Sequence, residues 1–404
     1  MTLSPHWFDT PPVKTLVAAF KEAGMPMRFV GGAVRDTVLG RPVHDIDVAT
    51  PALPNDVMAM LADAGITAIP TGIAHGTVTA VIEKKHFEIT TLRKDVTTDG
   101  RHAEVAYTDD WRQDAMRRDF TMNALYLSAG GELFDYVSGE ADAKNGRVRF
   151  IGDAGARIRE DYLRILRFFR FYAHYGKTAP DNEALAACAA QAAHIELLSA
   201  ERVQHEMLKL LAAPKSYHAI GFMIERGVFV HVFGFALKAA TALRRLEEMA
   251  IAFSQELSVA AKMLALALPT CAPIKAFARC WKLSHALSSQ LGMLEALVKA
   301  LSVNLSFPEQ KKYIRIYGNA VFKEAVMLAW ALESDMIDRA HPYHAMLILA
   351  GEWRPPEFPV SGKDLLALGI QEGKRVGEVL RSLEEVWEAG DYKATKEELL
   401  ARAK

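Results

Sequence analysis

The hydrophobic periodicity of this chain changes near residue 155, and this change constrains the fold more than any other feature of the sequence. Before it, apolar residues form short alternating or β-branched runs interrupted by glycine, which is typical of strands. These runs cover residues 27–32, 45–50, 76–82, 86–92 and 124–137, and a helical pattern over residues 13–23 ends at Gly24. After it, amphipathic helical patterns follow one another to the end of the chain. The pattern predicts an α+β fold, with a small mixed sheet in a head over 1–150, an all-α neck over 151–215, and a helical body and tail over 216–404.

Composition and charge exclude several classes of protein. Half of the 404 residues are apolar and 24% are charged, which is the balance of a globular chain with a large core. Its 48 basic and 49 acidic residues leave almost no net charge, so a polyanion must be met by a local patch. No signal peptide or run of eighteen uncharged apolar residues is visible, so we expect a cytoplasmic protein without membrane contact. Cys188, Cys271 and Cys280 are too scattered for a disulfide framework or a metal site.

An Asp-x-Asp sequence points to a cation. Asp45 and Asp47 alternate with Ile46 and Val48 along a predicted strand, so both carboxylates lie on one face. Two carboxylates about 4 Å apart repel by roughly 4 kcal/mol at an effective dielectric constant of about 20, and a cation between them removes this cost. Mg²⁺ is the cation that best suits carboxylate and phosphate oxygens. The alternative is a pair of solvated acids on an exposed strand edge.

The residues around this pair strengthen the cation hypothesis. Gly31 and Gly32 follow a strand and precede a helical stretch, so the backbone can approach a phosphate closely, and Arg35 in the first turns could reach an anion. Glu88, which shares a strand face with Thr90 opposite Phe87 and Ile89, is the best candidate for a third acidic ligand. An ordinary exposed strand residue is the alternative for Glu88. Together these residues predict a site for a metal-bound nucleoside triphosphate.

Five ordered segments then carry a family resemblance. They are "GGAVRD" with "DIDVAT", "RRDFTMNALY", "DYVSGEADAKNGRVRFIGD", "REDYLRILRFFRF" and "LSAERVQHEMLKLL", and they span residues 28 to about 210. In this order they resemble the motifs of the bacterial class of tRNA nucleotidyltransferases and of their relatives, the poly(A) polymerases. The resemblance implies that Asp45 and Asp47 bind two metal ions and activate the 3′ hydroxyl of an RNA primer, which attacks the α-phosphate of a triphosphate. It also implies that Gly32 and Arg35 hold that triphosphate.

The segment "RRDFTMNAL" would serve the sugar and phosphates of the nucleotide. Arg118 fits a phosphate or ribose contact. Asp119 and Asn123 lie four residues apart in a predicted helix and could hydrogen-bond a 2′ hydroxyl. The alternative is a helix cap with an Asp-Asn pair on the surface.

The segment "EDYLR" would determine which base enters. Asp161 and Arg164 lie three residues apart, and thus on one face of a predicted helix; a carboxylate accepts and a guanidinium donates, so the pair can read the edge of a base. The resemblance implies that this pair selects C or A without a nucleic-acid template. Arg167 and Arg170 continue at the same step and are predicted to meet phosphates. A Glu160–Arg164 salt bridge on a solvated helix is the alternative.

Two further segments were interpreted by the same resemblance. Residues 94–115 are polar and contain "DGRH", and family members that add the terminal A carry a flexible loop here, so the sequence favours full CCA addition; a plain surface connection is the alternative. Glu201 and Arg202 follow Ser199, a predicted helix N-cap, and we assign this segment no chemistry.

The functional expectation is therefore addition of C, C and A to tRNA 3′ ends from CTP and ATP with Mg²⁺, and no protein partner is implied. A poly(A) polymerase is one alternative, although the C-terminal sequence is mixed in charge and not strongly basic. An enzyme that adds only the A, and a catalytically silent RNA-binding protein, are two more. Beyond residue 210 no motif is identified, so tRNA binding there follows from analogy.

Overall fold

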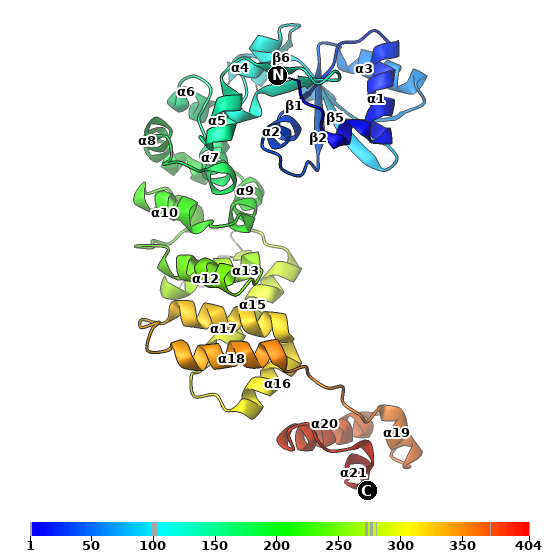
Figure 1. The fold of residues 1–404 in the computed structure, drawn as a ribbon, viewed down its shortest axis with the longest axis vertical. Helices are drawn as coiled ribbons and strands as arrows, with labels where there is room; N and C mark the ends of the chain where they lie inside the picture. Colours follow the sequence, from blue (N-terminus) through cyan, green and yellow to red (C-terminus); the bar gives the residue numbers. More distant parts are fainter. Residues whose placement is uncertain are drawn as a thin grey trace. The chain divides into compact units, whose positions relative to one another are not determined.

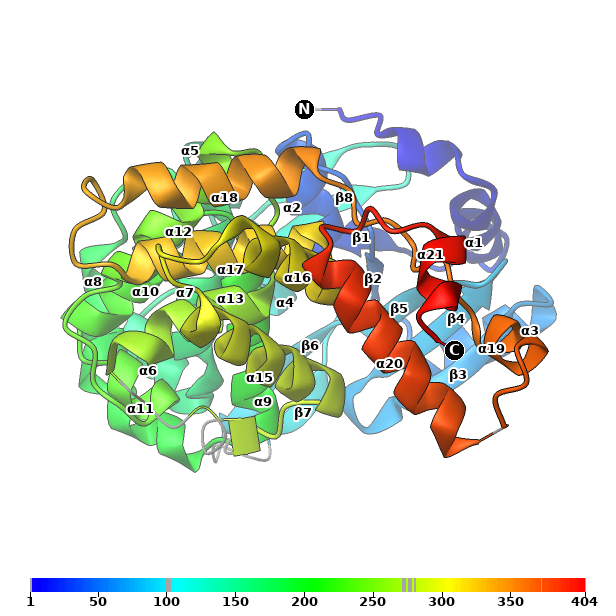
Figure 2. The same ribbon diagram turned by 90° about the horizontal axis from the view of Figure 1, so that it is seen from below.

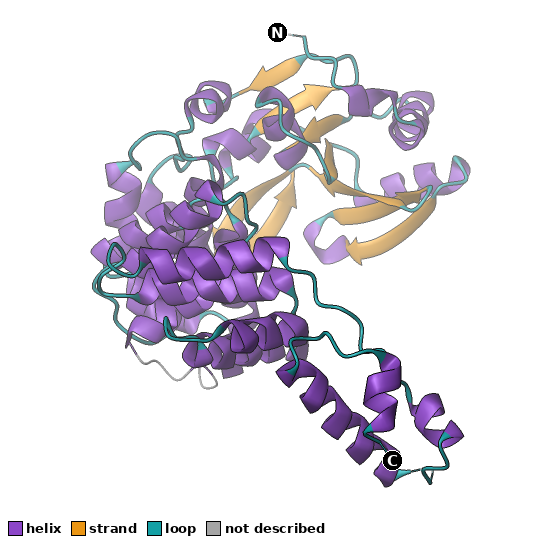
Figure 3. Ribbon diagram, turned by 60° about the horizontal axis from the view of Figure 1, so that its bottom comes forward, coloured by secondary structure: helices purple, strands orange, loops and turns teal. Residues whose placement is uncertain are grey.

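The computed structural model describes residues 2–98, 103–270, 274, 278–279, 281–371 and 373–403. These residues form two compact units, Met1–Ala239 and Ala240–Lys404. Figure 1 shows the helices and strands in chain order, and Figure 3 shows that the strands belong to the first part of the chain while the rest is helical. The predicted change of periodicity is confirmed. No helix in the described part of the chain combines the length and the apolar character needed to span a membrane.

The first unit contains a mixed sheet. Its described strands lie in the order β3-β4-β5-β2-β1-β8-β9. Their bounds are Arg28–Val30 (β1), Ile46–Thr50 (β2), Thr67–Gly72 (β3), Thr77–Ile82 (β4), Lys85–Thr91 (β5), Leu125–Ser128 (β8) and Leu133–Asp135 (β9). β2 pairs in parallel with β5, whereas the other pairs are antiparallel. β3, which we did not predict, carries mostly exposed side chains, so it lacks the alternation that marks a half-buried strand.

Three helices cover one face of this sheet. They are α1 (Pro11–Glu22), α2 (Gly32–Val38) and α3 (Pro54–Asp63). Phe29, Val48, Phe87 and Ile89, at most 1% exposed, project from the strands into the core that these helices close. The opposite face contributes Tyr126 to a smaller core, which also includes Ala115 of α4 (Trp111–Met116). Because side chains alternate along each strand, one face of the sheet packs against the three helices, and the other face can carry the side chains of a functional site.

A set of helices completes the first unit. Their bounds are Gly139–Asn145 (α5), Ala154–Glu160 (α6), Leu163–Tyr175 (α7), Asn182–Ala190 (α8), Ala200–Ala212 (α9), Tyr217–Glu225 (α10) and Phe229–Phe233 (α11). α7 is strongly amphipathic: Phe168 and Phe169 are fully buried, while arginines occupy the other side of the helix. It packs against α9 and α10.

The second unit is helical throughout its described residues. The bounds are Thr241–Ala252 (α12), Val259–Ala267 (α13), His285–Ala300 (α15), Phe307–Tyr317 (α16), Asn319–Leu332 (α17), Ala340–Glu352 (α18), Gly362–Ala367 (α19), Lys374–Ala389 (α20) and Lys396–Ala401 (α21). α17 packs against α12, α15, α16 and α18, and α17 and α18 lie side by side in Figures 1 and 2. Because α17 is surrounded, it is buried along most of its circumference. Trp387 of α20 anchors a separate small core with Leu365 and Leu399.

Candidate active site

The acidic residues are arranged by the register of three strands. Asp47 of β2 lies opposite Val30 of β1 and beside Glu88 of the parallel strand β5. Ile46 and Val48 are buried on the helix-covered face, so Asp47 projects from the other face, as its spacing predicted. Asp45 is exposed and precedes the first residue of β2, which corrects its expected position within the strand.

The carboxylate of Asp47 is held in an unfavourable electrostatic environment. Burial raises its pKa, the charges of Glu88 and Asp45 raise it further, and Arg118 opposes them, so that the pKa reaches about 6. Among the described residues no hydrogen bond or ion pair satisfies Asp45, Asp47 or Glu88. These acids therefore lack the compensation that buried or crowded carboxylates normally find within a protein.

This donor set fits a hard divalent cation that also binds the substrate. Mg²⁺ binds carboxylate oxygens, and it usually leaves several of its coordination positions to water and to phosphate oxygens of the substrate. Within the described residues, no cluster of three or more His, Cys, Asp and Glu side chains could by itself hold a metal ion. Asp45 and Asp47 can therefore supply only part of a coordination shell. A role for Glu88 as third ligand stays a prediction.

A cavity of about 550 Å³ lies next to Asp47. It is lined by Gly31, Gly32, Arg35, Asp47, Arg117, Arg118, Asp119, Asn123, Asp161, Leu163, Arg164, Arg167, Arg170, Phe171 and Arg202. The cavity brings together every predicted site residue except Asp45 and Glu88. Among these described lining residues seven are arginines and three are aspartates. Each of the seven arginines also forms an ion pair with an acid in or behind the lining: Asp36, Asp114, Asp119, Glu160, Asp161 or Glu206. The cavity is therefore rich in guanidinium donors, which suit the oxygens of a polyanionic ligand.

The glycine loop forms one wall of this cavity. Gly31 has a φ of +71°, which an L-residue rarely adopts, and it begins α2. Arg35 is buried, and its guanidinium donates to Asn123 Oδ1 at 2.6 Å and to the Tyr175 hydroxyl at 2.6 Å. It also forms an ion pair with Asp36 at 2.8 Å. Arg35 thus connects α2 to the opposite wall as well as facing the cavity.

The "RRD" segment is not a continuous helix, which corrects our expectation. α4 ends at Met116, and Thr121–Asn123 form a short 3-10 helix. Asp119 and Asn123 nevertheless meet, because Asn123 Nδ2 donates to Asp119 Oδ1 at 3.2 Å. Burial alone would raise the pKa of Asp119, but the ion pair with Arg167 and hydrogen bonds from Asn123 and the Phe120 amide lower it. Asp119 is therefore a charged anchor inside the site.

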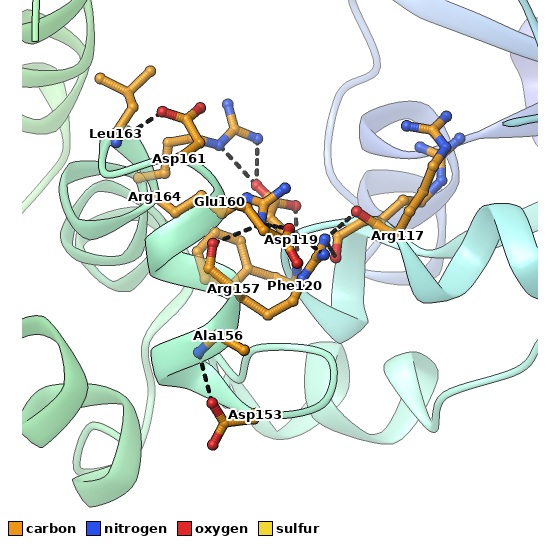
Figure 4. Close-up of polar contacts among 12 residues, drawn as sticks. Arg117, Asp119, Phe120, Asp153, Ala156, Arg157, Glu160, Asp161, Leu163 and Arg164 are labelled. Atoms are coloured by element: carbon orange, nitrogen blue, oxygen red, sulfur yellow. Dashed lines mark hydrogen bonds and ion pairs between the residues drawn. The ribbon is translucent and has the colours of Figure 1, made fainter. Parts of the chain in front are cut away.

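The "EDYLR" segment also departs from the prediction. α6 ends at Glu160, Asp161 has an extended conformation, and α7 begins at Leu163, so Asp161 and Arg164 do not share a helix. Arg164 forms an ion pair with Glu160, the alternative that the sequence had offered, and donates to the Arg157 carbonyl at 2.6 Å (Figure 4). Asp161 Oδ1 accepts from the Leu163 amide at 3.1 Å. Both side chains still line the cavity.

Two further arginines of α7 are paired across the site. Arg167 donates to Asp119 Oδ2 through Nε at 2.7 Å and Nη2 at 2.5 Å, and it lies 3.8 Å from Glu206 of α9. Arg170 forms an ion pair with Glu206 at 2.8 Å. Glu206 is only 4% exposed, so it places a buried negative charge behind the two guanidinium groups. A phosphate role for Arg167 and Arg170 stays a prediction.

Arg202 is a site residue that the sequence reasoning missed. Its guanidinium donates to Asp161 Oδ2 at 2.8 Å and lines the cavity. We had predicted only a helix start at Ser199, and α9 does begin at Ala200. An arginine in the first turn of a helix, where acids are favoured, was the available signal for a second role.

The segment predicted as a flexible loop contains regular structure on both sides. β6 (Arg93–Thr98) pairs with β7 (Ala103–Tyr107), and α4 follows. "DGRH", residues 99–102, lies outside the described residues, as do Cys271 and Cys280. The strand signal of β6 was hidden because five of its six residues are polar, whereas Ala103, Val105 and Tyr107 of β7 do recur at the strand period of two.

Comparisons with known proteins agree with this geometry. Residues 27–149 match a family model described as the poly A polymerase head domain, and residues 179–241 match a probable RNA and SrmB- binding site of polymerase A. The mitochondrial CCA tRNA nucleotidyltransferase 1 of Mus musculus is 36% identical over 395 residues, covering 97% of this chain and 89% of that protein. The CCA-adding enzyme of Enterococcus faecalis is 30% identical over 412 residues, covering 96% and 97%.

A comparison with solved structures also finds similarity to a CCA-adding enzyme. The Bacillus stearothermophilus CCA-adding enzyme in complex with CTP has a TM-score of 0.71 and 26% identity, with 98% of this chain and 97% of that chain covered. The chain belongs to the family of CCA-adding tRNA nucleotidyltransferases and poly(A) polymerases. It is a nucleotidyltransferase.

Proposed function

We propose that this protein adds C, C and A to the 3′ ends of tRNA, using CTP and ATP and releasing pyrophosphate. The observation that carries the proposal is the combination of Asp47, which has no hydrogen bond or ion pair among the described residues and a raised pKa, with an arginine-rich cavity beside it. A nucleoside triphosphate with its cation suits both, because the phosphate oxygens accept hydrogen bonds from guanidinium groups and the cation neutralises the carboxylates.

We infer the following roles for the residues of the site. Asp45 and Asp47 would hold two metal ions, which in this family are generally divalent and for which we propose Mg²⁺. Such a pair of ions would supply stabilisation of negative charge, one on the attacking oxygen and the other on the leaving pyrophosphate. Gly32, Arg35 and Arg118 hold the triphosphate, and Arg35 also connects α2 to the opposite wall through Asn123 and Tyr175. Glu88 stays a candidate third acid.

Base selection is proposed for the two side chains at the α6–α7 break. The carboxylate of Asp161 accepts hydrogen bonds, and the guanidinium of Arg164 donates them. Both side chains line the cavity, Asp161 from the extended segment after α6 and Arg164 from the first turn of α7. A pair of opposite hydrogen-bonding character can distinguish C and A from U and G by the donors and acceptors on the base edge. Arg167 and Arg170 add positive charge for the phosphates, and Asp119 and Asn123 can bond the ribose.

The division of labour along the chain is also a proposal. Residues 1–150 would carry catalysis, 151–215 base selection, and 216–404 the grip on the tRNA body. The relatives named above include a mitochondrial protein, so our expectation of a cytoplasmic location stays a proposal that cell fractionation would test.

The experiment uses tRNA transcripts that end before CCA, after one C and after both Cs. Each is incubated with Mg²⁺ and a single labelled triphosphate. We expect C on the first two and one A on the third, and Asp45→Ala should abolish all three additions while Asp9→Asn, which removes an exposed acid, leaves them unchanged.

Two results would contradict full CCA addition. Long A ladders on any RNA would indicate a poly(A) polymerase. Addition of A to the CC-ended transcript alone would indicate that another enzyme supplies the Cs.

A further inference from the structure

Asp114 of α4 is a buried carboxylate that none of the roles above uses. It is 1% exposed, and four groups converge on it. Oδ1 accepts from Arg117 Nε at 2.8 Å and from the Arg93 amide at 3.3 Å. Oδ2 accepts from Arg118 Nη2 at 3.0 Å and from the Tyr126 hydroxyl at 2.7 Å. Both carboxylate oxygens are therefore fully engaged.

These contacts leave Arg118 with one free edge. Its Nε donates to the Tyr126 hydroxyl at 3.2 Å, and its Nη2 is taken by Asp114. Nη1 has no hydrogen-bond partner among the described residues, and it lies 3.8 Å from the position that a Cβ on Gly31 would occupy. The remaining donor group is thus directed at the glycine loop, where the backbone comes closest to the cavity.

The rest of the surroundings fix this direction. Tyr126 is fully buried in β8, which pairs with β1, the strand that leads into Gly31. The Arg93 amide that reaches Asp114 belongs to β6. Asp114 is consequently held from two strands and cannot follow Arg118 if the arginine turns.

We propose that Asp114 is a positioning residue that aims Nη1 of Arg118 at the phosphates of the bound triphosphate. This deepens the proposed function, on which it rests, because it specifies which part of the substrate Asp114 affects. The phosphates beyond the first should depend on Asp114, whereas the base and the ribose should not. Arg118 keeps its positive charge when Asp114 no longer holds it. The weaker phosphate binding should therefore come from a misdirected guanidinium and not from a smaller electrostatic attraction.

A second acid of the same helix provides the matched control. Asp110 is the N-cap of α4, and its side chain accepts from the Arg112 amide at 2.8 Å. Asp110→Ala removes this cap and perturbs α4 at an exposed position without touching Arg118. If Asp114 only held α4 in place, the two substitutions would have similar effects on ligand binding.

The experiment is isothermal titration calorimetry of the full chain with CTP, CDP and CMP in the presence of Mg²⁺ and without RNA. Asp114→Asn should weaken CTP binding at least about 10-fold and CMP binding less than about 2-fold, and Asp110→Ala should change neither by more than about 2-fold. In an Arg118→Ala background, Asp114→Asn should cost no further CTP affinity, because a residue that acts through Arg118 has nothing left to position.

Asp114→Glu covers the case in which the Asn variant does not fold. It keeps the charge but displaces the carboxylate by one methylene group, so CTP binding should weaken about 3-fold or more while CMP binding is retained. The proposal is overturned if Asp114 variants weaken CTP and CMP equally, if Asp110→Ala matches Asp114→Asn, or if the effects of Asp114→Asn and Arg118→Ala add. A protein that shows the expected binding pattern but does not extend tRNA would overturn the proposed function and not this inference.

Discussion

Charged side chains are arranged differently in the two units of the molecule. Around the cavity of residues 1–239, the described lining contains seven arginines and three aspartates, and Asp47 has neither a hydrogen bond nor an ion pair with a described residue. In residues 240–404, Lys262 of α13 and Glu247 of α12 form a buried ion pair at 2.7 Å, with side chains 7% and 3% exposed. The carboxylate of Asp47 therefore needs a bound cation to balance its charge, whereas Lys262 and Glu247 balance each other within the folded chain.

The same difference appears where α16 meets α20. Arg315 forms ion pairs with Glu384 and, at 2.8 Å, with Glu388, and its guanidinium also lies 5.3 Å from the Trp387 ring. Opposite charges here match one another across two helices. A crowded carboxylate without an ion pair, as at Asp47, is therefore the feature that distinguishes the proposed binding site from a structural ion pair. Removing the negative charge should have opposite effects on stability in the two regions.

The largest expected effect is on catalysis by Asp47→Asn. The substitution removes one of the two proposed metal-binding carboxylates, so nucleotide addition should fall on the order of 10³-fold or more. The measurement is single-turnover incorporation of C into a tRNA transcript, with Asp9→Asn as the control. Incorporation by Asp47→Asn within about 10-fold of the wild type would contradict the metal assignment.

The next effect is on stability in the helical unit. Glu247→Gln removes the carboxylate charge that lies 2.7 Å from the buried ammonium of Lys262, which should lower the free energy of unfolding by about 3 kcal/mol. Urea denaturation measures this change, and the rate of C addition by the folded variant should be unaltered. A variant of wild-type stability would remove the contrast between the two regions.

The third effect is a pH dependence of stability that belongs to Asp47. Its pKa in the folded protein is about 6 against an ordinary value of 3.8, so between these pH values the folded state keeps a proton that the unfolded chain has lost. Stability contributed by the protonated group is present below about pH 4 and is lost as the pH rises through about 6. In metal-free protein, Asp47→Asn should therefore be more stable than the wild type by about 1–2 kcal/mol at pH 7, allowing for solvent screening.

The comparison for this prediction is urea denaturation in the presence of a chelator at pH 3.5 and pH 7. The advantage of Asp47→Asn should be present only at the higher pH. An equal advantage at both values would mean that its origin is not the charge of Asp47.

The smallest effect is expected from Arg202→Ala. This change releases Asp161 from its ion pair, so discrimination of CTP and ATP against UTP and GTP should fall about 10-fold. Stability should change by less than about 1 kcal/mol, because the Arg202 side chain is 46% exposed. Competition between labelled triphosphates measures the first quantity, and Glu201→Ala is the neighbouring control. Unchanged selectivity would confine Arg202 to a structural role.

Local features of the site could be predicted where a short segment contains all the necessary information. The face on which Asp47 lies follows from strand alternation, and the register with Glu88 places the third acid beside it. Prediction failed where helical spacing was assumed to continue. Asp161 lies in extended backbone between two helices, and a run of residues with good helical spacing does not indicate such a break.

By itself, the sequence determined the class of fold, the order of the motifs and the types of side chain that line the cavity. Periodicity and residue type are local properties of the chain. Only the tertiary structure decided which charges meet. Arg167 and Asp119 are 48 residues apart, Arg202 and Asp161 are 41 apart, and Asp114 takes an amide from Arg93. The energy of an ion pair depends on distance and on the surrounding dielectric, and both are fixed only when the helices and strands have packed.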